Sequence, residues 1–178
     1  MPRLPIRAPI LVLALLSAAP AFGQWLAPGR WATGDGFRPV APGTWMVLRQ
    51  NDGVEISAEG DHHVGRLTLW CTTTMPGGGL IFDTYNGSGL RHAPADAAEL
   101  TSEVVTLMVD AQRFDVAFVH IPWERQWVAD AVMSPSLMDA FANGSRLDLR
   151  NAAGEGITGY HLHGSSAARE AVRRACGF

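Results

Sequence analysis

Histidines offer the most suggestive chemistry in this chain of 178 residues. His161 and His163 lie two residues apart in a segment with the alternation of a β-strand, so we expect both imidazole rings on one face. Such a pair can chelate zinc or copper, with a third ligand drawn from His62, His63 or His120. Nothing in the sequence brings a third ligand near. Since exposed histidines on a sheet face are the commoner arrangement, we predict no metal site and no cofactor.

Carboxylates and small polar motifs are also present, but each has a simpler explanation. The segment 61–63 has the composition of an acid–base site, Asp-His-His, yet it lies in a loop flanked by glycines, where polar residues are expected. Glu124, Asp130 and Asp139 would suit glycoside hydrolysis if the fold brought two of them together. The chain has neither a Gly-x-Ser-x-Gly elbow nor a phosphate-binding loop. The sequence therefore predicts no catalytic residue.

Two tryptophans, Trp123 and Trp127, straddle the polar segment 124–126. They either anchor the core or line a binding surface. The usual burial of tryptophan favours the core for both.

The first residues have the three parts of a secretory signal. Arg3 and Arg7 precede an apolar run, residues 8–19, which is too short to span a bilayer, and small residues follow at spacings that a signal peptidase accepts. We therefore predict a signal peptide over residues 1–23, with the mature chain beginning at Phe22 or Gln24.

Export determines how Cys71 and Cys176, the only two cysteines, are interpreted. In an oxidising compartment such a pair is most simply a structural disulfide. The alternatives are a redox-active pair, whose cysteines usually lie close in sequence, and a zinc thiolate site, which needs more cysteines. In the chain-entropy model, closing so long a loop stabilises the fold by roughly 4–5 kcal/mol.

Charge and composition restrict the compartment and the partners. A formal net charge of −3 gives no electrostatic case for nucleic acid binding. No second apolar stretch could cross a membrane after signal cleavage. Every basic residue is arginine, a bias typical of GC-rich bacterial genomes. We expect a periplasmic protein, with secretion as the alternative.

Alternating apolar residues predict strands along most of the mature chain. A hairpin is expected over residues 44–58 with its turn at 50–53, because polar turn residues separate two short alternating runs. Further strands are predicted at 66–71, 80–85, 103–110, 113–121, 146–150 and 157–163. In the strand at 66–71, Cys71 shares a face with Leu67 and Leu69, which points it into the core.

Two segments have helical features. Ser134 and Pro135 are typical of a helix start, and the segment ends at 143–144. The last element has an apolar stripe at helical spacing, with Ser166 expected as its cap and Gly177 as its stop. Cys176 lies at the end of that helix.

Together these elements predict a mainly β protein. We expect an antiparallel β-sandwich or a curved sheet, with a short internal helix and a C-terminal helix, and α+β as the alternative class. After the signal peptide, residues 24–43 form an irregular arm rich in tryptophan and proline, and residues 44–178 form one disulfide-closed domain. Strand order does not follow from the sequence.

The order of motifs from residue 66 to 178 resembles small exported bacterial proteins. These motifs are the segment 67–71 ending in Cys71, the apolar strand at 114–119, the segment 145–150, and the run 160–168 that leads to Cys176. The pattern is similar to the type VI secretion-associated VasI-like family and to the invasion-associated locus B proteins. Tyr160 stands where phenylalanine is expected. The resemblance implies an accessory or interaction protein of the envelope, and it supplies no catalytic residues.

Three functions are compatible with these observations. The favoured one is a non-enzymatic periplasmic accessory protein with an envelope protein as partner, linked to secretion if the resemblance holds. The alternatives are a small-ligand or metal-binding module that uses surface histidines, and a hydrolase that acts on cell-wall or glycan substrates.

Overall fold

The computed structural model describes residues 43–49, 51–75, 77–83, 90 and 100–177. The predicted signal peptide, the arm except for Gly43, and the end of the strand predicted at 80–85 lie outside these residues.

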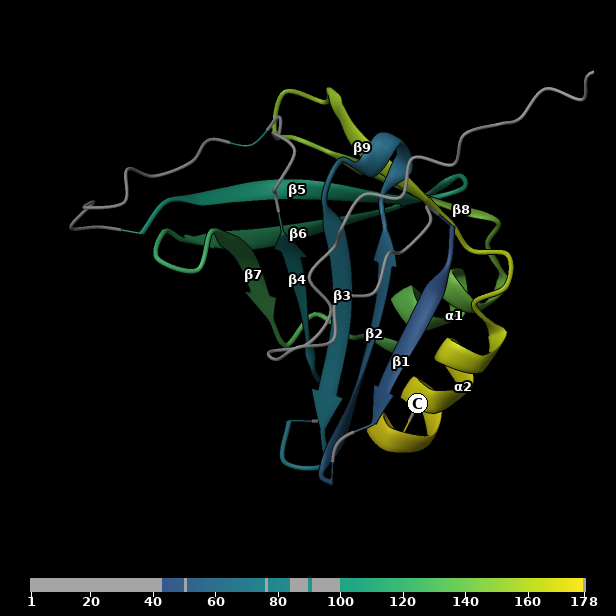
Figure 1. Ribbon diagram of the computed structural model, residues 1–178. Coiled ribbons are helices and arrows are strands. Elements are labelled where there is room, and N and C mark those ends of the chain that lie inside the picture. Colours follow the sequence, from purple (N-terminus) through teal and green to yellow (C-terminus); the bar gives the residue numbers. More distant parts are fainter. Residues whose placement is uncertain (1–42, 50, 76, 84–89, 91–99, 178) are drawn as a thin grey trace, which may run out of the picture.

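The described part of the chain is built on one antiparallel sheet of nine strands. Figure 1 shows that the sheet curls strongly, with the long β5–β6 hairpin running across the end of the first strands. The strands are β1 (Trp45–Arg49), β2 (Gly53–Glu59), β3 (Arg66–Thr72), β4 (Gly79–Asp83), β5 (Ser102–Val109), β6 (Gln112–Ile121), β7 (Gln126–Asp130), β8 (Arg146–Arg150) and β9 (Gly156–His161). The prediction of a mainly β fold is confirmed, and a curved sheet replaces the sandwich alternative.

Sequence-local hairpins build most of the sheet. Strands β1 to β4 pair in chain order, and β5 pairs with β6 over its whole length. The complete order is β1-β2-β3-β4-β7-β6-β5-β8-β9, so β7 rather than β5 lies beside β4. The pairing of β4 with β7 joins the strands β1 to β4 and the strands β5 to β9 into one sheet.

The inner face of the sheet forms the core. Leu67, Leu69 and Cys71 are each at most 2% exposed, which confirms the predicted inward face of β3. The largest fully buried side chains include Trp127, Tyr160 and Phe82, all on strands. Alternation with period two thus identifies the buried face correctly.

Helix α1 (Pro135–Asn143) begins and ends as predicted. The Ser134 hydroxyl accepts a hydrogen bond from the Leu137 backbone N–H at 3.2 Å, and Pro135 occupies the first turn. Leu137, Met138 and Phe141 are buried against the core. The Phe141 ring packs edge-on against Trp45 of β1, with centroids 5.0 Å apart. The helix therefore covers the inner face of the sheet.

Helix α2 (Ser166–Cys176) contacts β1, β2 and β3 through its apolar stripe. Ala168, Ala171 and Val172 form this stripe and are buried, and Gly177, the predicted stop, ends the helix in the left-handed conformation with φ 75°. The predicted cap is wrong. The N-cap is Ser165, and its hydroxyl donates to the Leu162 carbonyl at 2.6 Å instead of capping the helix.

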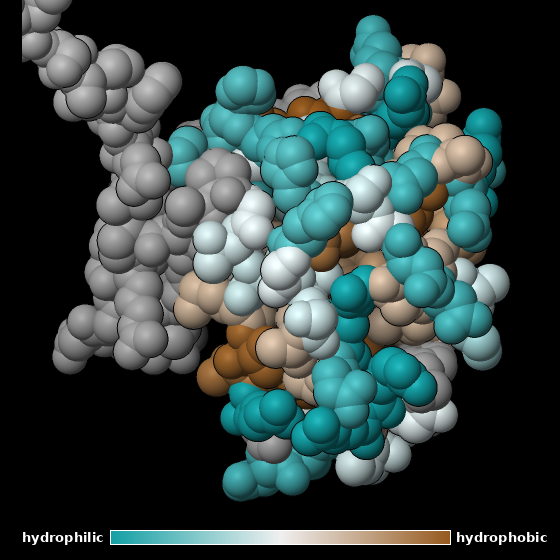
Figure 2. Space-filling view, turned by 90° about the vertical axis from the view of Figure 1, so that its right-hand side faces the viewer, coloured by the Kyte–Doolittle hydropathy of each residue, from teal (hydrophilic) through white to brown (hydrophobic). Residues whose placement is uncertain are grey.

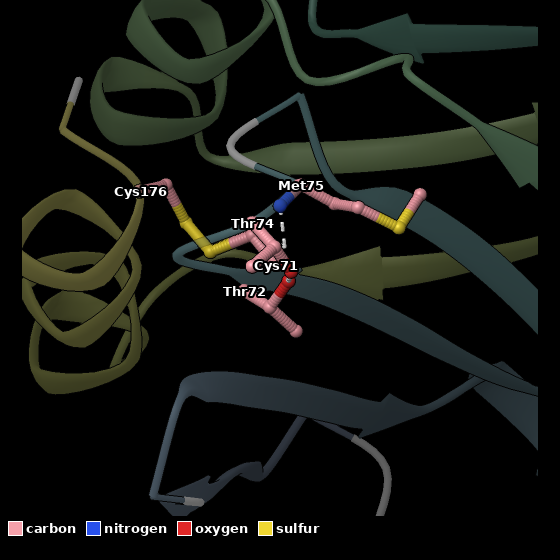
Figure 3. The surroundings of a disulfide bond; sticks show 5 residues. All are labelled: Cys71, Thr72, Thr74, Met75 and Cys176. Atoms are coloured by element: carbon pink, nitrogen blue, oxygen red, sulfur yellow. Dashed lines mark hydrogen bonds between the residues drawn. A yellow bond between two sulfur atoms is a disulfide. The ribbon is translucent and has the colours of Figure 1, made fainter.

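A disulfide joins Cys71 of β3 to Cys176, the last residue of α2 (Figure 3). The Cα atoms are 6.0 Å apart, which is ordinary for such a bond. The sequence favours this same pairing. The turn after β3 is held locally, because the Thr72 hydroxyl accepts a hydrogen bond from the Met75 N–H at 3.0 Å. The bond therefore fixes the C-terminal helix to a short, ordered strand end.

Curling brings the two edge strands of the sheet together. The Trp45 indole N–H, in β1, donates to the His161 carbonyl, in β9, at 2.8 Å. The short helix η1 (Asp61–His63) also contacts β9. Side chains, and not a backbone ladder, thus link the first strand to the last. Within the described residues, no helix is both long enough and apolar enough to cross a membrane.

Candidate functional site

The histidines considered as metal ligands lie in different parts of the structure. Strand β9 ends at His161, two residues earlier than predicted, and His163 lies in the turn that follows. Gly164, with φ 82°, turns the chain there towards α2. The predicted pairing of two imidazoles on one strand face is therefore wrong, because the chain must leave the sheet to begin the helix.

His62 and His63 belong to η1, which leads from β2 to β3. The curl of the sheet places η1 against β9, so that His161 Nε2 lies 3.9 Å from Asp61 Oδ1. His120 is elsewhere, 3% exposed on β6 and packed on the Trp127 ring at 5.0 Å. Within the part of the chain that the structure describes, no three histidine, cysteine or acidic side chains are grouped so as to hold a metal.

A charged cluster occupies the place where η1 meets the sheet. The Arg146 guanidinium donates to Asp61 Oδ2 at 2.6 Å and to Asp148 Oδ1 at 2.7 Å. The hydrogen bond to Asp61 is the largest cause of a raised pKa for Arg146, with Asp148 adding to the shift. This role of Arg146 does not follow from the sequence. Its pairing with Asp61 spans 85 residues, and alternation only predicts that Arg146 faces outward.

Beside this cluster lies a second acid–base contact. Glu59, at the end of β2, is 1% exposed, and its Oε1 is 3.5 Å from Nδ1 of His63. The loop 61–63 is thus more organised than a solvated turn. Asp61 is nevertheless held by Arg146, and His63 lies against Glu59. This arrangement fixes η1 to the sheet.

The three carboxylates considered for glycoside hydrolysis lie on different parts of the fold. Glu124 lies in the turn before β7, and Asp130 is the last residue of that strand. The five residues of β7 span about 13 Å. Catalytic carboxyl pairs are roughly 5–9.5 Å apart. Asp139 lies on an exposed position of α1.

One of the two tryptophans is buried and the other is exposed. Trp127 is fully buried at 0% exposure, which confirms its predicted place in the core. Trp123 is 71% exposed in the turn between β6 and β7, so its predicted core position is wrong. The reason is local. Trp127 falls on the inward register of β7, opposite His120, whereas Trp123 lies outside both strands.

Trp123 does not stand alone on the surface. Leu100 is 48% exposed and Val104 is 49% exposed. The backbone N–H of His120 donates to the Thr101 carbonyl, so the pairing of β5 with β6 extends one residue beyond Ser102. Leu100 therefore lies near the β6–β7 turn, which contains Trp123. Figure 1 shows the start of β5 and the β6–β7 turn together at the left end of the molecule. Leu100, Val104 and Trp123 are named here the Trp123 patch.

The neighbouring outer face of the sheet is also apolar. Ile81 pairs with Val128, which pairs with Val119, and all three are half-buried. In antiparallel sheets with one solvated face, that face is usually polar. Figure 2 shows the opposite side of the molecule, where hydrophobic surface is divided into small areas among hydrophilic residues. We take the Trp123 patch as the candidate contact surface because it holds the most exposed large hydrophobic side chain of the described residues.

Comparison of this chain with protein-family models, curated proteins and solved structures yields no match.

Proposed function

We propose that this chain is a non-enzymatic accessory protein of the bacterial envelope that acts in the periplasm by binding another protein. The secretory pattern of residues 1–23 and the resemblance of residues 66–178 to exported accessory families support the compartment and the role. The Cys71–Cys176 disulfide is compatible with an oxidising compartment. A link to secretion rests on the resemblance.

The observation that carries the proposal is the exposure of Trp123, the most exposed large hydrophobic side chain of the described residues, with Leu100 near the same turn. Burying a tryptophan removes a large apolar area from water, and tryptophan is enriched among the residues that dominate binding energy at protein interfaces. A partner with a complementary apolar surface would cover the Trp123 patch.

Site-specific photocrosslinking in the native host tests this contact. A photoreactive amino acid replaces Trp123 in the full-length exported chain, and the periplasmic fraction is analysed for adducts. We expect one discrete adduct. Met75 is the matched control position, because it is 45% exposed but lies in the turn after β3, away from the patch. No adduct is expected there.

Specificity is tested by adding Val104→Asp to the chain that carries the photoreactive residue. A carboxylate at this exposed position opposes apolar contact without disturbing the buried core. The adduct should weaken at least tenfold. Equal adducts from positions 123 and 75, or an adduct indifferent to Val104→Asp, would refute the proposed surface. An adduct of two copies of this chain would replace a foreign partner with self-association.

The compartment is tested separately by fractionation and alkylation of free thiols. We expect the chain in the periplasmic fraction, shortened by about 21–23 residues as the predicted cleavage sites require, with both cysteines protected from alkylation until reduction. A full-length cytoplasmic product with two free thiols contradicts the proposal.

A further inference from the structure

A shallow depression lies on the outer face of the sheet where β5, β6 and β8 run side by side. Its volume is about 420 Å³, and its floor and rim include Thr106 and Met108 of β5, Arg113 of β6, Arg150 of β8 and the turn 151–154. Small-molecule sites commonly fall between roughly 300 and 1,000 Å³. The space is therefore adequate for a ligand about the size of one substituted ring.

Both charged residues that line the depression are arginines. Arg113 is paired with Met108, and Arg150 with Thr106, so the two arginines flank β5 from opposite sides and are offset by two residues. With strands about 4.8 Å apart and a rise of about 3.4 Å per residue, their Cα atoms are about 12 Å apart. Two long side chains at that separation can reach a single ligand lying over β5.

Hydrogen-bonding capacity remains on both guanidinium groups. Arg113 uses its Nε to donate to the Asp115 carboxylate, at 3.0 Å and 3.2 Å. Arg150 donates through Nη1 to the Gly154 carbonyl at 3.3 Å. A guanidinium has five N–H donors in a planar fork that suits carboxylate and phosphate groups. These contacts leave several donors on each arginine for a ligand.

The rim is held in place without a ligand. Asn151 is 6% exposed, and its Oδ1 accepts from the backbone N–H groups of Ala153, at 3.0 Å, and Glu155, at 2.9 Å. The Ala152 N–H donates to Glu103 Oε1 at 3.1 Å. On the floor, the Thr106 hydroxyl donates to Asp115 at 2.8 Å. A site with its wall already ordered loses less conformational entropy on binding.

We propose that this depression binds a small organic anion whose carboxylate or phosphate group lies between Arg113 and Arg150. The thioether of Met108 and the methyl groups of the turn 151–154 provide apolar contact for the body of such a molecule. Asp115, opposite Thr106, and Asp148, opposite Met108, place two carboxylates beside the floor, so a ligand with negative charge spread over the whole molecule is disfavoured. Val104 of the Trp123 patch lies two residues before Thr106 on the same face of β5, so the two surfaces adjoin, but binding of a small anion does not depend on the proposed protein partner.

Isothermal titration with three probes tests this site on the oxidised mature chain. Phenyl phosphate and benzoate carry the two acid groups on the same ring, and benzyl alcohol is their neutral counterpart. We expect saturable binding of at least one anion and none of the alcohol. The stronger of the two anions identifies the acid group that the site prefers.

Variants locate the binding. Arg150→Gln and Arg113→Gln should each weaken the preferred anion about tenfold, because each removes a charge-assisted hydrogen bond. Arg150→Lys should fall between wild type and Arg150→Gln, because it keeps the charge and loses the fork. Arg173→Gln, on the exposed side of α2, is the control and should bind as wild type.

Circular dichroism of each variant shows whether the fold is retained, and Arg150→Lys gives an independent measurement if a glutamine variant does not fold. Absence of saturable binding for both anions overturns the proposal. Binding of benzyl alcohol with the same affinity as the anions also overturns it. So does wild-type affinity for the preferred anion in both single variants, Arg113→Gln and Arg150→Gln.

Discussion

Arg146 holds η1 and two neighbouring strands together through one side chain. It bridges Asp61 of η1 and Asp148 of its own strand, and it lies against Gly159 of β9. A Cβ atom at residue 159 would lie too close to the guanidinium and to the Asp148 carboxylate, so a larger residue there would displace the Arg146 side chain from its present position. Because the Arg146 side chain is 38% exposed, water screens these ion pairs, and their main effect is to position η1.

Asp110 has a comparable role at the turn between β5 and β6. Its carboxylate accepts hydrogen bonds from the Ser145 hydroxyl at 2.7 Å, the Ser145 N–H at 3.0 Å and the Arg146 N–H at 3.1 Å. The Ser145 hydroxyl is the largest cause of a lowered pKa for Asp110, and His163 adds a smaller electrostatic effect in the same direction. The ionised form is thus favoured in the folded protein.

The pKa shift of Asp110 predicts a defined pH dependence. A carboxyl group whose folded pKa lies below its ordinary value of 3.8 stabilises the fold above that pH. This contribution is lost as the pH falls through the folded pKa. We expect Asp110→Asn to lower the free energy of unfolding at pH 7, with a difference from wild type that shrinks towards pH 3. Urea unfolding at both pH values measures it.

Asparagine is the suitable replacement because it tolerates the positive φ of residue 110, which is 50°. Asp139→Asn, on the exposed side of α1, controls for the loss of one negative charge. A stability difference for Asp110→Asn that is constant between pH 7 and pH 3 would show that the carboxylate charge is irrelevant.

At the scale of elements, local sequence signals were reliable where they act within one turn. The hairpin of β1 and β2, the β5–β6 hairpin and the start of α1 all follow from residues only a few positions apart. The start of α2 was misplaced by one residue, since two consecutive serines precede it and only the tertiary contact of Ser165 with Leu162 distinguishes them.

Ser134 and Ser166 provide a prediction about helix capping. Ser134→Ala should destabilise the protein by about 1 kcal/mol, because it removes the acceptor for the Leu137 N–H. Ser166→Ala should change stability by less than about 0.5 kcal/mol, because Ser166 is an exposed first residue of α2 and not its cap. Equilibrium unfolding in urea compares the two. Equal losses would contradict the assigned caps.

At the scale of the whole molecule, two long-range links keep the curled sheet closed on its helices. One is the disulfide between β3 and α2, and the other is the contact of Trp45 with the His161 carbonyl and the Phe141 ring. Both connect residues from the first half of the described chain to residues near its end. The inner core lies between them.

Removal of the disulfide should lower the free energy of unfolding by roughly 4–5 kcal/mol in the chain-entropy model, since the cysteines are 105 residues apart. Urea unfolding of the wild-type chain with and without a reductant measures this. Hydrogen exchange should accelerate first in α2, which the bond holds to β3. The double variant Cys71→Ser, Cys176→Ser is the control and should not respond to the reductant. Identical unfolding curves for oxidised and reduced wild type would rule out a stabilising bond.

The sequence alone determined the features that depend on neighbouring residues. Alternation identified the buried face of β3, helical spacing identified the stripe of α2, and the count of cysteines left one pairing. These signals are local because side-chain period and capping are properties of a few consecutive residues.

Only the tertiary structure decided the strand order, the bridge from Arg146 to Asp61, and the division of the histidines among separate places. It also exposed Trp123 while burying Trp127, and it set Arg113 and Arg150 on either side of β5. The Arg146–Asp61 bridge and the place of Arg150 beside β5 depend on residues far apart in sequence that meet because strands distant along the chain are neighbours in the curled sheet. No local pattern encodes such meetings, and the depression between Arg113 and Arg150 arises from one of them.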